Sequence, residues 1–456
     1  MKTKFYLLIF ALFIFAGTSF AQEKIYTCIN EKGERLFSIK AKYVRPFSEG
    51  MAEVEKTVLI NNKAFTRSGF VDSTGALVIE PKYDEVYKFQ FGVAWVKEPG
   101  ATGFYLINKK GERITSSTWE KVGNFNDGIS AVYSPDGKMG FVNRNGKIIA
   151  PCEYLGDGFS EGLACLMPYD EQTARYGFMD TTGTVVIPFQ FNQAGVTSFE
   201  NGECRVQING VTCLINQKGE VIFKPTLTKN TMGFYDGLSA SYTTADRGGW
   251  GFYNRNNVWV IKPQYDNVND FSGGLAIVEK AGKFGLIDTL GNFVIPMQYT
   301  SLIGNGALDG YFVVELTENG ESHYLNHQGK PFTSVAVKFI YPSYGSRFHA
   351  FSNPDGKYGY LNIDGTLHIA AQFEKAEPFY ENKAWVKGNT ESLKLASGRS
   401  EAHFVKEYVV GESVFSKKNG MGEFYPATVE QVTELYYLVK FTDETQEWVV
   451  FDSLKR

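Results

Sequence analysis

The sequence predicts an all-β fold made of a repeated unit, with a small β module at the C-terminus. Of the 456 residues, 15% are aromatic and 47 are glycine. Aromatic residues and frequent glycines favour short strands and tight turns over helices. A short motif also recurs at steps of 34 to 38 residues over most of the chain. A unit of this size cannot bury a core alone, so neighbouring copies must stack.

The middle part of each unit is a strand followed by a turn that begins with Asp or Asn. Two clear copies are YGFMDTTG at 176–183 and FGLIDTLG at 284–291. The first glycine, or the residue replacing it, falls at positions 69, 103, 140, 177, 213, 251, 285, 323 and 359. The Asp or Asn can accept hydrogen bonds from backbone N–H groups in the turn, and the closing Gly supplies a positive φ.

The leading part of most units places an aromatic-x-x-Gly sequence before a short strand, as in FSEG at 47–50. We expect the ring to fill the gap between one unit and the next, and a small residue after the glycine to leave room for it. The rings are Phe47, Phe125, Phe159, Phe199 and Phe271, and the small residues are Ala52, Ala94, Ala164 and Ala276.

The closing part of each unit is a third strand that carries a proline. These prolines are Pro81, Pro151, Pro188, Pro225, Pro263 and Pro296. Because proline lacks an N–H, we expect pairing to stop at that point.

The two ends of the repeated region complement each other. Residues 26–43 contain a middle and a closing part, and residues 379–386 contain only a leading part. Together they make one complete unit, which would remove both sheet edges if the array closed on itself. This favours a closed β-propeller of about ten blades, each of three or four strands. The alternative is an open β-solenoid or arc with the end fragments as caps.

The pattern G-[FY]-[IVLM]-[DN]-x-x-G, then [VI]-I-x-P-x-[YF], then F-x-[DEN]-G-x-[AS]-x-V resembles the WG (KWG) repeat family, which is found widely in bacteria. The resemblance covers roughly residues 26–386, so we assign 22–387 to a WG-repeat domain. Trp before Gly occurs once, at Trp250-Gly251. The family has no shared catalytic residues, so the resemblance implies a fold and not a chemistry.

The N-terminus reads as a secretory signal peptide covering residues 1–21. Lys2 and Lys4 precede an apolar run at 5–16, and Ser19-Phe20-Ala21 matches a small-x-small cleavage site. The apolar run is too short to span a membrane. The sequence therefore predicts cleavage near Ala21 and export of a chain that does not span the membrane, to the periplasm or beyond.

The period stops after Lys387. Residues 388–408 are polar and read as a linker, and 409–456 contain several short strand-like runs. This tail resembles the Tudor/Agenet class of small SH3-like barrels through its Tyr-Pro-Ala-x-Val core. The resemblance places Tyr425, Phe441 and Trp448 at barrel aromatics, which in some of that class form a cage for a methylated cation. Barrel core is the favoured role of Phe441 and Trp448, while Tyr425 and Tyr436 are the candidates for exposed contacts.

Charge and motif content narrow the function classes. The net charge is −4, with no basic field suited to nucleic acid. No HExxH, GxSxG, P-loop or CxxC motif is present, so the sequence predicts no catalytic set, no metal and no cofactor. His323 and His327 have helical metal-site spacing, but they fall on a strand and a turn. The five cysteines have irregular spacing and indicate buried free thiols rather than a disulfide framework.

Two further sets of residues are candidates for function. Trp95 and Trp385 occupy equivalent positions in two leading strands, where they either pack between units or form an exposed platform for sugars. Ser73, Thr181 and Thr289 follow the Asp of a middle turn, and this Asp-[Ser/Thr] pattern is similar to the O-glycosylation sequon of exported Bacteroidota proteins. The turn alone also explains these three residues.

The sequence thus predicts a non-enzymatic exported binding or scaffold protein whose partner is an envelope or secreted protein. One alternative is carbohydrate or peptidoglycan binding through exposed aromatics of the array. A second alternative is an unrecognised envelope enzyme.

Overall fold

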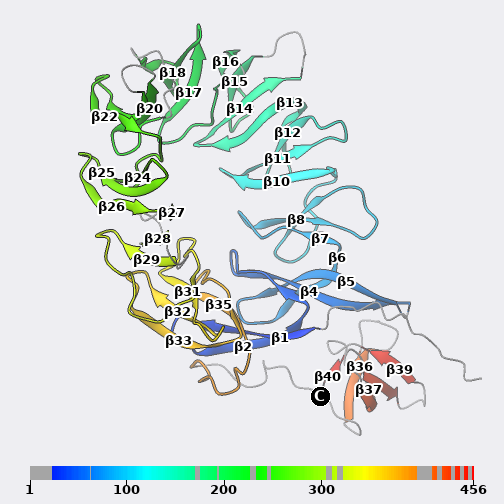
Figure 1. Ribbon diagram of the computed structural model, residues 1–456. Coiled ribbons are helices and arrows are strands. Elements are labelled where there is room, and N and C mark those ends of the chain that lie inside the picture. The colour runs from blue at the N-terminus through cyan, green and yellow to red at the C-terminus, as the bar shows by residue number, and fades with distance from the viewer. Residues whose placement is uncertain are drawn as a thin grey trace, which may run out of the picture. The chain divides into compact units, whose positions relative to one another are not determined.

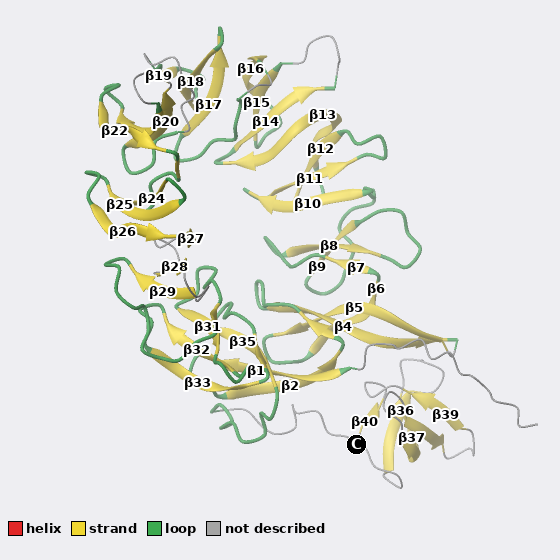
Figure 2. Cartoon of the chain, viewed as in Figure 1, coloured by secondary structure: helices red, strands yellow, loops and turns green. Residues whose placement is uncertain are grey.

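The structure is a computed structural model, and in it the chain forms short strands that alternate with turns. The residues it describes are 23–61, 63–169, 175–192, 195–225, 233–243, 248–303, 311–315, 322–397, 413–417, 424–432, 437–441, 446–449 and 454–455. These residues contain strands and loops and no helix (Figure 2). Ile25–Lys406 forms one compact unit, the repeat domain, and Glu407–Arg456 belongs to a second. The predicted signal peptide at 1–21 lies outside the described residues.

The repeat domain contains the strands β1 to β35. Their bounds are β1 (Lys24–Asn30), β2 (Arg35–Ala41), β3 (Tyr43–Val44), β4 (Met51–Ile60), β5 (Lys63–Asp72), β6 (Leu77–Tyr83), β7 (Glu85–Val86), β8 (Val93–Lys97), β9 (Tyr105–Asn108), β10 (Lys121–Asn126), β11 (Ile129–Tyr133), β12 (Met139–Asn143), β13 (Ile148–Ser160), β14 (Leu163–Pro168), β15 (Tyr176–Asp180), β16 (Val185–Phe191), β17 (Glu203–Ile208), β18 (Val211–Asn216), β19 (Val221–Phe223), β20 (Leu238–Thr243), β21 (Gly249–Asn254), β22 (Trp259–Tyr265), β23 (Asn267–Val268), β24 (Leu275–Lys280), β25 (Lys283–Asp288), β26 (Phe293–Tyr299), β27 (Ser301–Ile303), β28 (Tyr311–Glu315), β29 (Ser322–Asn326), β30 (Phe339–Ile340), β31 (Phe348–Ser352), β32 (Tyr358–Asn362), β33 (Leu367–Phe373), β34 (Lys375–Ala376) and β35 (Lys383–Lys387).

These strands form nine sheets within the described residues, most of them with three or four strands. Their orders are β2-β1-β35-β34, β3-β4-β5-β6, β7-β8-β9, β10 to β16 in sequence, β17-β18-β19, β20-β21-β22, β23-β24-β25-β26, β27-β28-β29 and β30-β31-β32-β33. The seven-stranded sheet holds two repeats, because β13 pairs with β12 at its start and with β14 at its end. Each repeat is thus a small antiparallel meander, as the spacing of turn signals predicts.

The middle turns have the predicted chemistry. In the turn after β15, Asp180 Oδ1 accepts from the backbone N–H groups of Thr182 at 2.9 Å and Thr184 at 3.0 Å. Asn143 and Asn216 make the same pair of bonds in their own repeats. The closing residue of the turn has positive φ, at 93° for Gly183 and at 59° for Asn257, where glycine is replaced.

The prediction that proline stops pairing is wrong in most repeats. Pro81 lies inside β6, at a bulge where the pairing jumps from Ser68–Tyr83 to Phe70–Ile79. The bulge needs no N–H from the proline, and it crosses directly over Gly69. A Cβ on Gly69 would lie 2.4 Å from Ile79 O and 2.7 Å from Pro81 N. Similar bulges cross Gly140, Gly177, Gly251, Gly285 and Gly359. The first glycine of the middle part is therefore needed because the bulge of the closing strand passes too close for a side chain.

The aromatic residues before the leading strands fill the gaps between repeats, as predicted. Phe47 is 3% exposed and packs with Val54 of its own repeat and with Phe37 and Trp385 of the preceding sheet. Phe271 packs in the same way between Phe252 of the preceding repeat and Ala276 of its own. The small residues Ala52, Ala94, Ala164 and Ala276 are all buried in these clusters.

The two ends of the repeated region share one sheet. Strand β1 pairs with β35 in the register Thr27–Val386 to Asn30–Lys383 (Figure 1). The predicted linker begins too early, because residues 388–397 pack on the same sheet. Arg35 N donates to Lys394 O at 2.8 Å, and Ala396 N donates to Arg35 O at 2.9 Å. Thr390 is buried and its hydroxyl lies 2.7 Å from that of Thr27.

The tail forms one five-stranded antiparallel sheet in the order β39-β38-β37-β36-β40. Its strands are β36 (Ser413–Lys417), β37 (Phe424–Val432), β38 (Tyr437–Phe441), β39 (Gln446–Val449) and β40 (Leu454–Lys455). The last strand returns to pair with the first.

We expect Gly69→Ala to lower the free energy of unfolding by about 2–3 kcal/mol, because the new Cβ must displace backbone atoms of β6. Gly158→Ala is the matched control, since its nearest atom is Asn126 Nδ2 at 4.0 Å, and we expect it to cost less than about 0.5 kcal/mol. Urea denaturation followed by tryptophan fluorescence measures both. Equal losses in the two variants would contradict the close approach.

The middle turns also predict an acid dependence of stability. The Thr182 hydroxyl and turn N–H groups lower the pKa of Asp180, and the Asn292 amide with turn N–H groups lowers that of Asp288. A carboxyl whose pKa is lower in the folded state stabilises it above the unfolded pKa and loses that effect as the pH falls through the folded pKa. The double variant Asp180→Asn/Asp288→Asn keeps an acceptor and should lose less thermal stability than wild type between about pH 5 and pH 2. Melting temperatures across that range test this, and parallel curves would contradict it.

Candidate functional site

The indoles of Trp95 and Trp385 are not an exposed platform. They are 1% and 2% exposed, and each one stacks on the phenylalanine that leads the next repeat. Trp95 Nε1 donates to Ser130 Oγ at 3.0 Å, and Trp385 Nε1 donates to Arg45 O at 3.0 Å. Packing between repeats, the first of the two predicted roles, is therefore confirmed for both residues, and the alternative of an exposed ligand platform is wrong.

The other predicted site residues have mixed positions. Ser73, Thr181 and Thr289 lie in middle turns and are half-buried. In sister repeats the residue at this turn position reaches the repeat before it, as Gln217 Nε2 does by donating to Glu161 O at 3.1 Å. In the tail, Tyr425, Phe441 and Trp448 fall on β37, β38 and β39, of which only the backbone is described. Tyr436 lies outside the described residues.

Metal and thiol chemistry find little support in the described part of the chain. No group of three or more His, Cys, Asp or Glu side chains there could hold a metal ion. The five cysteines are free thiols, and four of them are buried, as predicted. Burial raises the pKa of Cys204 to about 11, which disfavours the reactive thiolate. None of the described residues forms a helix able to cross a membrane.

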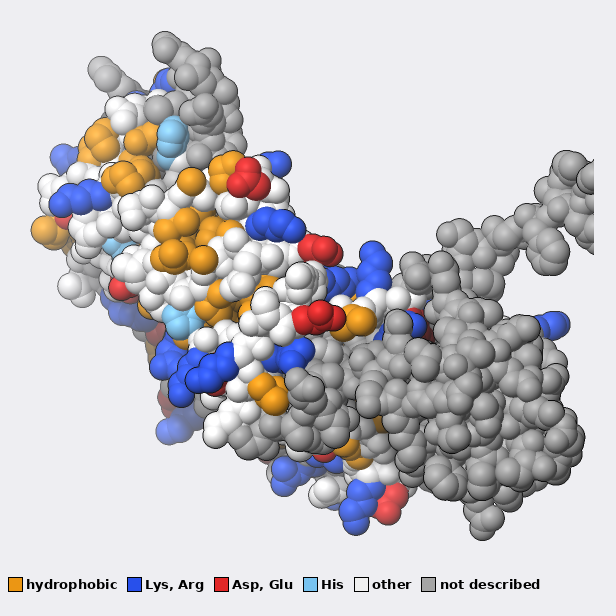
Figure 3. All heavy atoms as spheres, turned by 90° about the horizontal axis from the view of Figure 1, so that it is seen from below, with side chains coloured by type: hydrophobic (Ala, Val, Ile, Leu, Met, Phe, Trp, Pro, Cys, Tyr) orange, Lys and Arg blue, Asp and Glu red, His pale blue; other side chains and the backbone are white. Residues whose placement is uncertain are grey.

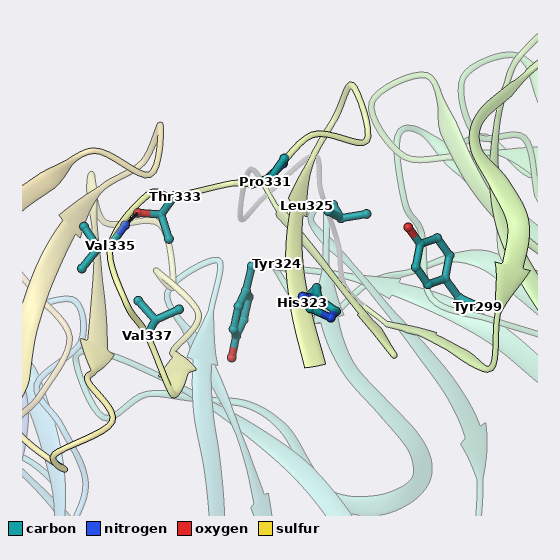
Figure 4. A pocket seen from close by; sticks show the side chains of 8 residues that line it. All are labelled: Tyr299, His323, Tyr324, Leu325, Pro331, Thr333, Val335 and Val337. Atoms are coloured by element: carbon teal, nitrogen blue, oxygen red, sulfur yellow. Dashed lines mark hydrogen bonds between the residues drawn. The ribbon is translucent and has the colours of Figure 1, made fainter. Parts of the chain in front are cut away.

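A cavity of about 420 Å³ lies beside β29, where the repeat pattern is broken. His323 takes the place of the first glycine, and the segment after its turn makes one bridge, Leu325–Pro331, before it diverges. Figure 4 shows Tyr324 on the side of Val335 and Val337, with His323 on the side of Tyr299. The Tyr324 hydroxyl accepts from Ile340 N at 3.0 Å, so it is engaged in structure.

A smaller cleft of about 300 Å³ is lined by charged residues from consecutive repeats. Tyr235 Oη donates to Glu200 Oε2 at 3.0 Å, and burial together with Glu200 raises the pKa of Tyr235 to about 12. Arg255 pairs with Glu203 at 2.5 Å and lies over the ring of Phe234. Burial raises the pKa of Asp270, while nearby Arg205 lowers it. Opposite charges offset one another here, so the cleft has no strong preference for one sign of ligand.

The leading turns provide a more regular candidate surface. We call the residue directly before the glycine of each leading turn the tip residue. Within the described residues, the tip residues are Glu49, Phe91, Asp127, Glu161, Asn201, Asp236, Gly273, Tyr344 and Glu381, with Asn382 in place of the glycine in the last turn. All of these tips have φ between 49° and 62°, and the residue after each one is also left-handed. Such a turn exposes successive backbone N–H groups that the hairpin itself does not use.

Acidic tips link each leading turn to the next. Glu161 accepts from Asn201 N at 2.6 Å and from Gly202 N at 2.8 Å. Asp127 accepts from Gly162 N at 2.8 Å, and Asp236 accepts from Gly274 N at 2.7 Å. The other links run from Glu49 to Gly92 N and from Glu381 to Glu49 N and Gly50 N. The backbone N–H groups of a leading turn thus form a binding site for a carboxylate, and the acidic tip of the preceding repeat supplies that carboxylate.

Four of the described tips have no carboxylate for this link: Phe91, Asn201, Gly273 and Tyr344. Phe91 is 42% exposed and Tyr344 is 65% exposed, although both have positive φ. Aromatic residues are unusual in the left-handed region, where Gly, Asn and Asp are preferred. The sequence contained a signal for Phe91, since FQFG at 89–92 differs from FSEG at 47–50 only at the middle two residues. Its exposure could not be read from that pattern.

Exposed apolar side chains also recur on the closing strands. Val78, Ile148, Val186, Val258, Phe293 and Leu367 lie in or beside these strands and are 42–57% exposed. In the space-filling view, apolar side chains occur in separate groups among charged ones (Figure 3). The repetition follows from the alternation of each closing strand, whose inward residues are buried.

Comparison with known protein families supports the repeat assignment. Seven stretches match the family model described as WG containing repeat, at residues 26–57, 69–98, 139–166, 176–211, 250–284, 284–316 and 358–389. The chain contains WG repeats. The glycine of the WG pair is the residue over which the closing strand bulges, so it is retained at Gly69 and Gly140 where the tryptophan is not. Among curated proteins, none matches the sequence.

Solved structures give only distant likenesses to these WG repeats. BamB from Moraxella catarrhalis is 11% identical, with 68% of this chain and 98% of that chain covered, at a TM-score of 0.26. The Pan2 WD40 domain of Neurospora crassa is 12% identical, with 58% of this chain and 87% of that chain covered, at a TM-score of 0.25. Hsv2p of Kluyveromyces lactis is 10% identical, with 63% of this chain and 96% of that chain covered, and its TM-score is also 0.25. Scores this low carry no conclusion about function.

The link between the last and first leading turns can be tested directly. We expect Glu381→Gln to lower the free energy of unfolding by about 1 kcal/mol, because the charged acceptor shared by two backbone N–H groups is lost. Glu391→Gln is the control, since Glu391 is exposed and accepts no hydrogen bond from a described residue. Denaturant midpoints measure both variants. A Glu381→Gln protein as stable as the control would rule out a stabilising link.

Proposed function

We propose that this chain is a non-enzymatic exported binding or scaffold protein that contacts a partner protein through its leading-turn tips. The observation that carries the proposal is the pair of exposed aromatic tips, Phe91 and Tyr344, with φ of 53° and 49°. A side chain in the left-handed region costs about 1–2 kcal/mol, and the exposed part of each ring gains nothing from burial. Such strain at an exposed position is typical of a functional surface, and aromatic side chains are enriched where protein interfaces are strongest.

We further propose that the WG repeats close into a propeller-like ring of about ten units. Two observations support closure. Strand β35 completes the sheet of β1 and β2. The carboxylate link from Glu381 to Gly50 N, at 2.8 Å, also repeats the link found between consecutive repeats, such as Glu161 to Gly202 N at 2.8 Å. A closed ring would hold all leading turns on one face, where a partner could contact several tips at once.

The tail and the export signal complete the proposal. The sheet order of the tail, in which β40 returns to β36, is compatible with a Tudor/Agenet-like barrel that adds a second contact point. Export with cleavage near Ala21 rests on the N-terminal pattern of charge, apolar run and small residues. An envelope or secreted protein is then the partner that such a chain would meet.

Photo-crosslinking in the native host tests the binding surface. A benzophenone side chain placed at position 91 or 344 of the full chain should yield a discrete protein adduct, while one placed at Val258, which is 57% exposed on a closing strand, should not. Phe91→Ser/Tyr344→Ser should then lower co-purification of that partner at least about tenfold, in line with the loss of two interface anchors.

Three results would count against this function. Equal adducts from position 258 would mean that the tips are not special. Saturable binding on a glycan array that is lost in the double tip variant would support the carbohydrate alternative instead. Turnover of a screened envelope polymer by the purified chain would support an enzyme.

A further inference from the structure

The turn at Asp127–Gly128 follows the aromatic tip Phe91 and is an open member of a set of otherwise filled sites. In five sister turns, a carboxylate from the repeat before accepts from the backbone N–H groups. Phe91 has no acceptor to offer. Within the described residues, the N–H groups of Asp127 and Gly128 have no acceptor, and the carboxylate of Asp127 is turned away toward Gly162 N.

Gln90 joins the same two repeats beside the turn without filling the site, as Ser48 and Ser160 do next to filled turns. Its side chain accepts from Phe125 N at 3.1 Å and donates to Phe125 O at 3.4 Å. The two repeats are therefore held together one step before the turn. This arrangement leaves the turn N–H groups available, and the ring of Phe91 rests 6.3 Å from that of Phe125 while staying partly exposed.

The preceding turn shows what a filled site looks like. There, the Glu49 carboxylate accepts from Gly92 N at 2.7 Å and lies 3.5 Å from Lys109 Nζ. Lys109 is the second residue of the middle turn in the same repeat as Gly92. Arg144 holds the equivalent position in the repeat of Gly128, and its backbone N donates to Gly128 O at 3.1 Å. Its side chain is exposed, and among the described residues it forms no ion pair.

We propose that Gly128 N–H, Asp127 N–H and Arg144 bind a carboxylate group of the partner polypeptide, with Phe91 contacting the apolar part beside it. The sister site defines the ligand: one carboxylate, held by backbone N–H donors and one cation. Charge-assisted bonds of this type are short and directional, so they select a carboxylate over an amide. This inference rests on the proposed binding function and adds the chemistry of the partner group.

The test uses purified full-length chain labelled with 15N and small peptide probes in place of the partner. Acetyl-Gly-Glu-Gly-amide carries only a side-chain carboxylate, acetyl-Gly-Gln-Gly with a free C-terminus carries only a terminal one, and acetyl-Gly-Gln-Gly-amide carries neither. We expect saturable downfield shifts of the Asp127 and Gly128 amide protons with one or both acidic probes and none with the neutral probe. Gly162 and Gly202, whose N–H groups are already bonded, serve as internal controls and should not shift.

Matched variants separate filling of the site from loss of the ring. Phe91→Glu supplies the carboxylate that sister repeats carry at this position and should abolish the shifts. Phe91→Gln introduces a side chain of nearly the same size as glutamate but without its charge, and this variant should retain the shifts. Arg144→Gln should weaken binding several-fold and reduce its dependence on salt. Thermal melting checks that each variant is folded.

The proposal is overturned if Gly128 does not shift with either acidic probe, if Gly162 shifts equally, or if Phe91→Glu binds as well as Phe91→Gln. Such a failure would leave the crosslinking result at positions 91 and 344 intact, since that experiment needs no carboxylate. Conversely, probe binding without any crosslinked partner would retain this site and remove the proposed binding function.

Discussion

The structure depends on the contact between consecutive repeats, because each repeat has too few strands to bury both of its faces. The ring before each leading strand enters the gap toward the preceding sheet, as Phe271 does against Phe252. The glycine that ends each middle turn approaches the preceding closing strand. A Cβ on Gly291, for example, would lie 3.3 Å from Ile261 Cγ1. Together these contacts fix the spacing of neighbours, and the buried core is continuous from one repeat to the next.

The same spacing explains why the turns can carry function. Because neighbouring leading turns are held at a constant separation, a short acidic side chain on one turn reaches the N–H groups of the next. Where the tip residue is Phe91, Asn201, Gly273 or Tyr344, the geometry of the turn is kept and the link is lost. The protein thereby presents a few polar backbone sites and exposed rings on an otherwise linked surface. Changing a tip residue alters the surface without altering the core.

The sequence predicted much of the fold correctly. It located the repeat period, the turns that begin with Asp or Asn, the ring that fills each gap, and the pairing of residues 26–43 with 379–386. It misjudged the effect of the prolines on strand pairing, because a proline inside a bulged strand and a proline after a strand look the same in the sequence. It also ended the repeat domain at Lys387. The polar segment after it packs through backbone bonds to Arg35 that composition does not reveal.

The functional site was less accessible from the sequence. Trp95 and Trp385 drew attention as large aromatics, yet both face the next repeat and are buried. Phe91 and Tyr344 looked like ordinary deviations from a repeat, yet they are exposed and left-handed. Whether a ring is buried depends on which side of the pleat faces a neighbour, and that is set by the register between strands far apart in sequence.

The sequence by itself determined the local structure of this protein: the places of the strands within each repeat, the chemistry of each middle turn and the repeat period. These follow from short-range rules, since glycine, proline, Asp and Asn act on the backbone beside them. Only the tertiary structure decided which turn accepts a carboxylate from its neighbour and which turn stays open. That outcome requires an acceptor about 40 residues away to meet two N–H groups, as Glu161 meets Asn201 and Gly202, and no pattern within one repeat contains it.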